Sequence, residues 1–141
     1  MRRYLVVAHR TLGGQHLIDE AQRRMAEGPC RFHLLVPCHH PHDHSWSDHE
    51  IEEQARRVLD AGLERFTAIG AVVDGEVGDT NPVYAVDGLL RREHFDEIIL
   101  STLPAGPSRW LKVDVLSRMR RQFALPITHL VAEPETADTT G

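Results

Sequence analysis

The sequence predicts an α/β fold: an open five-stranded parallel sheet, doubly wound, with helices on both faces. Short apolar runs alternate strictly with longer segments in which apolar residues recur at helical spacing. This alternation is typical of strand–helix–strand units, whose right-handed crossovers place successive helices against the sheet. In addition, the first run (residues 4–8) is apolar without alternation, as in a strand that is covered on both faces.

Five runs are expected to form the strands. Each is short and apolar, and most are bounded by glycine, proline or polar residues. The expected strands are residues 4–8, 32–36, 69–73, 97–102 and 127–132. We interpret the stretch bracketed by Gly75 and Gly78 as a short polar connection that follows the third strand.

Four segments carry the helical period, namely residues 15–26, 50–66, 81–92 and 110–123. Ser47 or Asp48 is expected to cap the second helix, and Asp79 or Thr80 the third, because such side chains accept hydrogen bonds from unpaired N–H groups. Pro82 falls in the first turn of the third helix, where its missing N–H costs nothing.

Composition predicts one soluble domain over residues 1–132. Apolar residues make up 41% of the 141-residue chain and charged residues 26%, which is ordinary for a globular protein. Residues 133–141 are rich in proline, threonine and acidic side chains, and we expect this tail to be disordered. The formal charge is −5, and without the three acids of the tail it is −2. General nucleic-acid binding requires a basic face, so we expect no such partner.

The two cysteines favour a reducing, cytoplasmic location. Cys30 and Cys38 flank one expected strand. A strand of that length spans ~25 Å, too far for a disulfide between its ends. Unpaired cysteines are typical of cytosolic chains. No apolar run approaches the roughly 18–20 residues of a membrane span, so no membrane partner is expected.

Several motifs of nucleotide-binding α/β proteins are absent. No Gly-x-Gly-x-x-Gly follows a strand, and no Gly-Lys-Ser/Thr occurs. The run Gly13-Gly14-Gln15-His16 is similar to nucleotidyltransferase loops that place a histidine beside a phosphate at a helix N-terminus. Because no second phosphate motif accompanies it, we interpret this run as a turn that leads into the first helix.

A histidine-rich loop invites a metal interpretation. Five histidines lie within eleven residues: His39, His40, His42, His44 and His49. Imidazoles at short spacing can bind zinc, nickel or copper. Pro41 breaks this run, and no regular secondary structure would hold the rings in place. We therefore interpret it as a polar loop beside the ligand edge of the sheet and expect no resident metal.

The candidate ligand site lies at the carboxyl ends of the strands, where open α/β sheets bind their ligands. The first strand ends at His9, and a strand–loop–helix unit follows Glu97. Eight residues are expected to converge there: His9, Arg10, Val36, Pro37, Ser101, Thr102, Ser108 and Arg109. Neither cysteine has an acid or base partner at a recognisable spacing, and no catalytic residue is predicted.

The order of elements over residues 3–132 resembles the universal stress protein family. The resemblance lies in Gly78-Asp79-Thr80-Asn81-Pro82 before a helix, then Phe95-Asp96-Glu97-Ile98-Ile99-Leu100, and in Ala124-Leu125-Pro126 before the last strand. It implies a Rossmann-like fold of the adenine nucleotide alpha hydrolase type. It also implies a non-enzymatic stress-response or regulatory domain and a homodimer formed through the last strand.

The chain departs from the ATP-binding members that it resembles. Those members carry Asp at the end of the first strand, Gly-x-x-Gly after the fourth, and Gly-Ser/Thr before the last helix. This chain has His9 at the first position, Ser101 and Pro104 at the second, and Val113-Asp114 near the third. The resemblance therefore implies that ATP does not bind in the usual mode, and no cofactor is expected.

Two other functions remain open at the level of sequence. The first is a nucleotide- or anion-binding sensor with altered loops, in which ATP or AMP would be the ligand and Arg109 could pair with an anion. The second is a small metal-assisted enzyme on the same fold that uses the histidine-rich loop.

Overall fold

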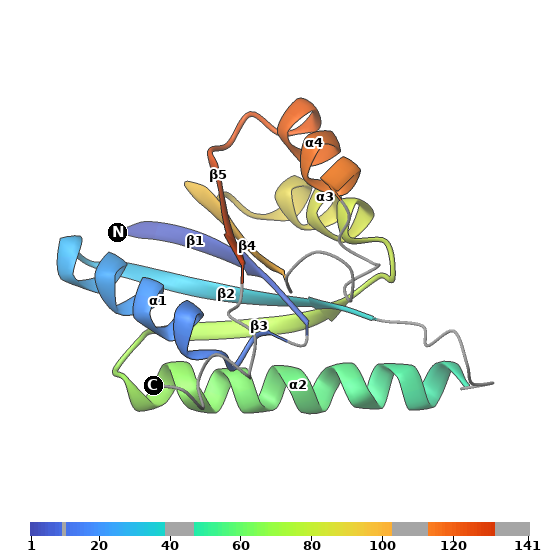
Figure 1. Cartoon of the computed structure of the whole chain (residues 1–141), viewed down its shortest axis with the longest axis horizontal. Coiled ribbons are helices and arrows are strands. Elements are labelled where there is room, and N and C mark those ends of the chain that lie inside the picture. Colours follow the sequence, from blue (N-terminus) through green and yellow to red (C-terminus); the bar gives the residue numbers. More distant parts are fainter. Residues whose placement is uncertain (10, 39–46, 103–112, 132–141) are drawn as a thin grey trace, which may run out of the picture.

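The computed structural model describes residues 1–9, 11–38, 47–102 and 113–131, with side chains of the last segment from residue 116 onward. Within these residues, five strands form one sheet in the order β3-β2-β1-β4-β5, and all neighbouring strands are parallel (Figure 1). The strands are β1 (Arg2–Val7), β2 (Cys30–Pro37), β3 (Val73–Gly78), β4 (Glu97–Thr102) and β5 (Ile127–Val131). The predicted five-stranded parallel sheet is confirmed.

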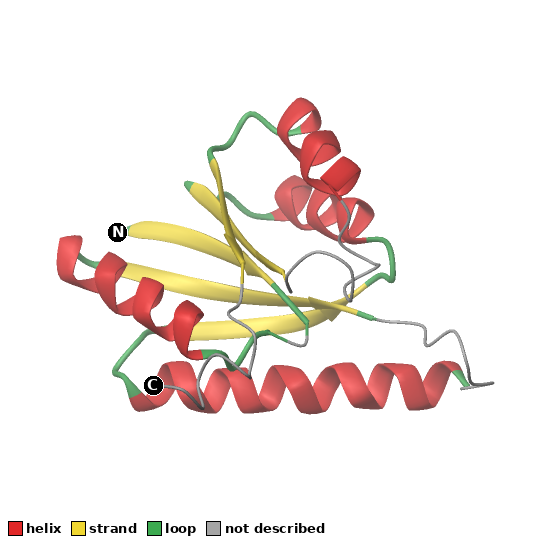
Figure 2. Cartoon of the chain, viewed as in Figure 1, coloured by secondary structure: helices red, strands yellow, loops and turns green. Residues whose placement is uncertain are grey.

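Helices cover both faces of this sheet, as the doubly wound prediction requires. The helices are α1 (Gln15–Glu27), α2 (Asp48–Ala68), α3 (Pro82–Arg92) and α4 (Val113–Gln122). α1 and α2 lie on one face, and α3 and α4 lie on the other (Figures 1 and 2). Among the described residues, no helix is both long enough and apolar enough to cross a membrane.

The alternation of side chains along the central strands divides the core in two. In β1, Tyr4 and Val6 pack on the α1/α2 face, whereas Leu5 and Val7 pack on the α3/α4 face. All four are at most 1% exposed. A strand buried on both faces has no polar positions, which explains why the apolar run at the N-terminus shows no period of two.

The third strand was predicted in the wrong place. Residues 69–73 were expected to form it, but α2 continues to Ala68, a turn with Gly70 at φ +87° follows, and β3 begins only at Val73. β3 is an edge strand that is only partly buried, so apolar character is not required of it. Gly75, predicted to lie in a connection, lies inside the strand. The position requires glycine because a Cβ there would sit 2.6 Å from the main-chain oxygen of Leu34.

The helix caps partly match the prediction. Ser47 caps α2 and forms a reciprocal capping box with Glu50. The cap of α3 is Asn81, whose side chain accepts from two backbone N–H groups, and not Asp79 or Thr80. Asp79 instead accepts a hydrogen bond from the backbone N–H of Asn81 at 2.9 Å. It therefore stabilises the turn that precedes the helix.

Most other boundaries lie within two residues of the prediction, and β4 matches it at both ends. β1 begins at Arg2 because main-chain pairing does not depend on the side chain, so a polar end can join the ladder. Three predicted features lie outside the described residues: the start of the last helix, Ala132, and the tail at residues 133–141.

Cys30 and Cys38 are both free thiols, as predicted, and burial raises the pKa of each.

Candidate functional site

The strand order places a topological switch point between β1 and β4. β1 continues into α1 on one face of the sheet, and β4 leads toward α4 on the other. Ligands of open α/β folds bind outside the carboxyl ends of two such strands, because the two connections diverge there and leave a crevice. His9 and Ser101, which stood in the predicted site, are located at these two strand ends.

Ser101 joins three elements at this switch point. Its hydroxyl oxygen is fully buried and lies 2.7 Å from Oγ1 of Thr11 and 2.8 Å from Nε2 of His16. Thr11 belongs to the connection after β1, and His16 lies in the first turn of α1. The serine hydroxyl carries only one proton, so at least one of its two partners donates to it.

The loop before α1 is shaped around the imidazole of His16. A Cβ on Gly14 would lie 2.7 Å from two atoms of that ring, so only glycine lets the ring approach so closely. Arg65 of α2 donates to the carbonyl oxygen of Gly13 at 2.7 Å and to the side-chain oxygen of Gln15 at 3.2 Å. The turn that leads into a helix is confirmed. The contact between His16 and Ser101 was not predicted, although the Gly-Gly-Gln-His run was the signal for it.

A second polar pair lies at the same edge on the other face. Thr102 Oγ1 is 2.8 Å from Nε2 of His129, which comes from the neighbouring strand β5. Adjacent residues of a strand point to opposite faces, so Ser101 faces α1 and Thr102 faces the side of α4. Burial, and then the charge of Arg120, lower the pKa of His129, which favours its neutral ring.

The predicted site residues differ in what they can offer. His9, Ser101 and Thr102 are buried polar side chains at the edge of the sheet. Val36 is fully buried in the α1/α2 core, so only its main chain can face a ligand, and Pro37 has no N–H to donate. Arg10, Ser108 and Arg109 lie outside the described residues, as do His39, His40, His42 and His44 of the histidine-rich loop.

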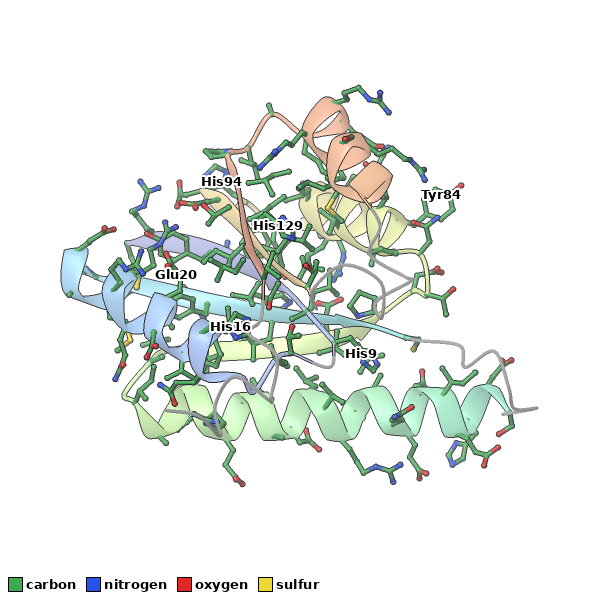
Figure 3. All side chains as sticks on the ribbon, viewed as in Figure 1. His9, His16, Glu20, Tyr84, His94 and His129 are labelled. Atoms are coloured by element: carbon green, nitrogen blue, oxygen red, sulfur yellow. The ribbon has the colours of Figure 1, made fainter. Side chains whose placement is uncertain are left out.

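Around the switch point between β1 and β4, the described side chains offer hydroxyl and imidazole groups, whereas the carboxylate of Asp79 follows β3, two strands away on the same edge. The set comprises His9, Thr11, His16, Ser101, Thr102 and His129, none of which is acidic. The positive end of the α1 dipole lies at the same edge, since α1 begins at Gln15 after the extended residue Gly14. Such a set can bind an anion or a polar neutral group. Figure 3 shows His9 at this carboxyl edge, at the opposite end of the sheet from His94, which precedes β4.

Solved structures share this fold. No protein-family model and no curated protein sequence matches the chain. A universal stress protein family protein from Burkholderia pseudomallei has a TM-score of 0.64 and 16% identity, over 91% of this chain and 94% of its own. A family protein from Arabidopsis thaliana with AMP bound has a TM-score of 0.65 and 11% identity, over 100% and 96%. A universal stress protein from Archaeoglobus fulgidus has a TM-score of 0.59 and 12% identity, over 92% and 97%. The chain therefore has the fold of solved universal stress proteins, and the resemblance found in its sequence is confirmed at the level of the fold.

Proposed function

We propose that this chain is a divergent universal stress protein, a non-enzymatic regulatory domain of the cytoplasm that binds a nucleoside monophosphate at its carboxyl edge. The observation that carries the proposal is the meeting of Thr11, His16 and Ser101 at the β1/β4 switch point. These groups lie where the fold binds ligands. A neighbour with the same fold has AMP bound.

The sequence disfavours a triphosphate ligand. A triphosphate needs several backbone N–H donors, which glycine-rich loops supply in many nucleotide-binding proteins. Pro104 and Pro107, in the segment after β4, have no N–H to donate. A single phosphate requires fewer donors, and the hydroxyls and imidazoles at the edge of the sheet can supply them.

Calorimetric titration with AMP, ATP and cyclic AMP tests this proposal. AMP should bind more tightly than ATP. Ser101→Ala should weaken AMP binding by about fivefold, because a hydrogen bond to a charged group gains about 1 kcal/mol over the neutral hydrogen bond that it replaces. Ser117→Ala, which removes an exposed hydroxyl from α4, is the matched control and should bind like the wild type. Absence of heat with all three nucleotides would contradict nucleotide binding, and tighter binding of ATP would contradict the choice of ligand.

One observation favours an enzyme as the second candidate. His16 and Ser101 lie at the distance of a general base and its nucleophile. Any ligand that reaches the buried oxygen of Ser101 must first displace Thr11 or His16, however, and displacement of His16 would separate the base from the nucleophile. Incubation with AMP and ATP followed by ³¹P NMR should show no product. Turnover that Ser101→Ala abolishes would overturn the non-enzymatic proposal.

We also propose that two copies pair through β5. This strand lies at one end of the sheet order, so one side of its main chain is available for another strand. Val131 at its end is 50% exposed, which leaves apolar surface for a partner to cover. Light scattering at micromolar concentration should give the mass of a dimer, and Val131→Lys should shift it toward the monomer. A wild-type monomer would contradict the proposal.

A further inference from the structure

A second group of chemically capable side chains lies away from the carboxyl edge, on the α3/α4 face. His33 of β2 stands opposite Asp74 of β3 in the sheet register. Its Nδ1 is 2.8 Å from an oxygen of Asp74, and its Nε2 is 3.1 Å from Oε1 of Glu76. Glu93, which follows α3, completes the group: one ligand atom each from His33, Glu76 and Glu93 lie within 4.8 Å of one another. We call these three residues the His33 cluster.

Both ring nitrogens of His33 face carboxylate oxygens, which a neutral imidazole cannot satisfy. A neutral ring has one N–H, so a proton on Nδ1 that donates to Asp74 leaves a lone pair on Nε2. That lone pair would then lie 3.1 Å from the negative oxygen of Glu76. His33 is only 7% exposed but the side chain of Glu76 is 34% exposed, so water screens this repulsion only in part. A second proton on the ring or a metal ion would each place a positive charge between Nε2 and Glu76 and remove this repulsion.

We propose that the His33 cluster binds one Zn²⁺ ion through Nε2 of His33 and one carboxylate oxygen each from Glu76 and Glu93. Bond lengths of about 2.0–2.2 Å in a tetrahedral site place ligand atoms roughly 3.4 Å apart. The observed separations, from 3.1 Å up to 4.8 Å, reach that value by small rotations of the two glutamates. Water would fill the fourth position, as in zinc sites with three protein ligands.

Asp74 acts as a positioning residue for this ion. Its hydrogen bond to Nδ1 holds the proton there and leaves Nε2 free to bind metal, which is the usual carboxylate–histidine–metal arrangement. Phe95 packs beside the ring, with centroids 5.8 Å apart, and limits its rotation. The imidazole is thus oriented before an ion arrives.

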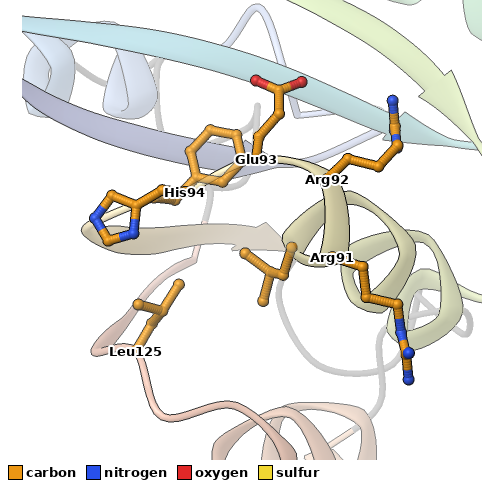
Figure 4. A pocket seen from close by; sticks show the side chains of 7 residues that line it. Arg91, Arg92, Glu93, His94 and Leu125 are labelled. Atoms are coloured by element: carbon orange, nitrogen blue, oxygen red, sulfur yellow. The ribbon is translucent and has the colours of Figure 1, made fainter.

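Two arginines hold the carboxylates without using all of their oxygens. Arg92 pairs with Oε2 of Glu76 at 2.9 Å, and Arg3 pairs with Oε1 of Glu93 at 2.6 Å. The ion would take the other oxygen of each glutamate. Figure 4 shows Arg92 and Glu93 extending to the same side from the end of α3. Both residues also line a shallow pocket of about 330 Å³, which His33 and Glu76 do not line. An ion can reach the cluster from solvent because the side chains of Glu76 and Glu93 are 34% and 32% exposed.

The alternative is that these groups form only an ion-pair network that fastens β3 and the end of α3 to the sheet. The test must also separate the cluster from the histidine-rich loop, which can bind zinc by itself. The starting protein therefore carries alanine in place of His39, His40, His42 and His44. It is stripped with a chelator and titrated with Zn²⁺ against a chromophoric competitor, and Co²⁺ absorption reports on the ligand field.

The starting protein should bind one Zn²⁺. Adding Glu76→Gln and Glu93→Gln should weaken zinc binding by about 100-fold or more, and Asp74→Asn by about 10–100-fold. Glu64→Gln, an exposed glutamate of α2, is the matched control and should leave affinity unchanged. Circular dichroism establishes that each variant is folded. Should the double variant not fold, the comparison rests on Glu93→Gln and Asp74→Asn alone.

Two results would overturn the proposal. The first is a starting protein that binds no zinc, because all zinc would then belong to the histidine-rich loop. The second is zinc affinity that the substitutions of Glu76, Glu93 and Asp74 leave unchanged. Neither result bears on nucleotide binding at the carboxyl edge, since Ser101→Ala removes no zinc ligand and should leave zinc affinity as it was.

Discussion

Replacement of Arg24 should destabilise the fold strongly, because this guanidinium neutralises two buried carboxylates. Arg24 of α1 donates to both oxygens of Glu97 in β4, at 2.6 and 2.9 Å, and to Glu20 at 2.7 Å. Glu97 and Glu20 are only 7% and 4% exposed. Arg24→Met keeps most of the apolar stem but leaves both carboxylates without this partner. We expect the free energy of unfolding to fall by about 3–5 kcal/mol.

The reverse substitution should cost less. Glu97→Gln leaves Arg24 paired with Glu20 and keeps an acceptor for the hydroxyl of Thr128, so we expect a loss of about 1.5–3 kcal/mol. In the double variant the buried charge of Glu97 is gone, and the total loss should be smaller than the sum of the two single losses.

Urea unfolding followed by circular dichroism measures these differences. The matched control is Arg91→Met, which removes an exposed helical pair with Asp87 and should cost about 0.5 kcal/mol or less. A loss below about 1 kcal/mol for Arg24→Met, or losses that simply add in the double variant, would refute the reasoning.

The same pair predicts a dependence on pH. Burial alone would raise the pKa of Glu97, but the hydrogen bonds from Arg24 and Thr128 outweigh burial and hold that pKa below its ordinary value of 4.5. A carboxyl with a lowered pKa in the folded state contributes stability above pH 4.5 and loses it as the pH falls toward the lowered value. The stability difference between wild type and Glu97→Gln should therefore shrink below pH 4.5. A difference that stays constant or grows there would contradict this assignment.

Three further predictions concern local features. Gly75→Ala should lower the free energy of unfolding in urea by about 1–3 kcal/mol, because the new Cβ would lie 2.6 Å from a main-chain oxygen of β2. Gly88→Ala should instead stabilise α3 by about 0.5–1 kcal/mol, because nothing lies within 4 Å of the new Cβ. Asn81→Ala should cost about 1 kcal/mol in the same measurement, since two backbone N–H groups lose their acceptor, and an unchanged midpoint would contradict its role as a cap. In an NMR titration His129 should have a pKa below 6.5 that rises in Arg120→Gln; a pKa at or above 6.5 in the wild type would contradict the lowering by burial.

The core of this fold is predictable because burial dictates its residues, and the edge strand is not. β4 is predicted at both ends because all six of its residues are buried. Its first four residues, 97–100, include no glycine, proline or other residue typical of turns. β3 is partly exposed and contains two glycines, so its sequence looks like a connection. Its identity depends on contacts with β2 that the local sequence does not express, such as the close approach of Gly75 to Leu34.

The candidate site was predictable in position but not in partners. Parallel strands end at one edge, so His9, Ser101 and Thr102 could be placed together from the order of elements alone. The hydrogen bond between His16 and Ser101 joins residues 85 apart in the sequence. The Gly-Gly-Gln-His run marks His16 as a candidate, but no local pattern identifies Ser101 as its partner. The His33 cluster was missed for the same reason. Its residues come from β2, β3 and the segment after α3, and each one reads in isolation as an ordinary strand or surface residue.

The last two residues of β4 limit how tightly any ligand can bind at the carboxyl edge. Ser101 and Thr102 are polar but only 0% and 6% exposed, and a buried hydroxyl is tolerated because it is hydrogen-bonded. Thr11 and His16 satisfy the first hydroxyl, and His129 satisfies the second. A phosphate that bonds to Ser101 must displace one of these partners or share it. The net gain is then the difference between two hydrogen bonds, about 1 kcal/mol, unless the ligand also satisfies the displaced group. His16 is the partner that can also bond to the phosphate, because it lies in the first turn of α1, where the helix dipole attracts an anion. Substitution of His16 should therefore reduce nucleotide affinity at least as much as Ser101→Ala does.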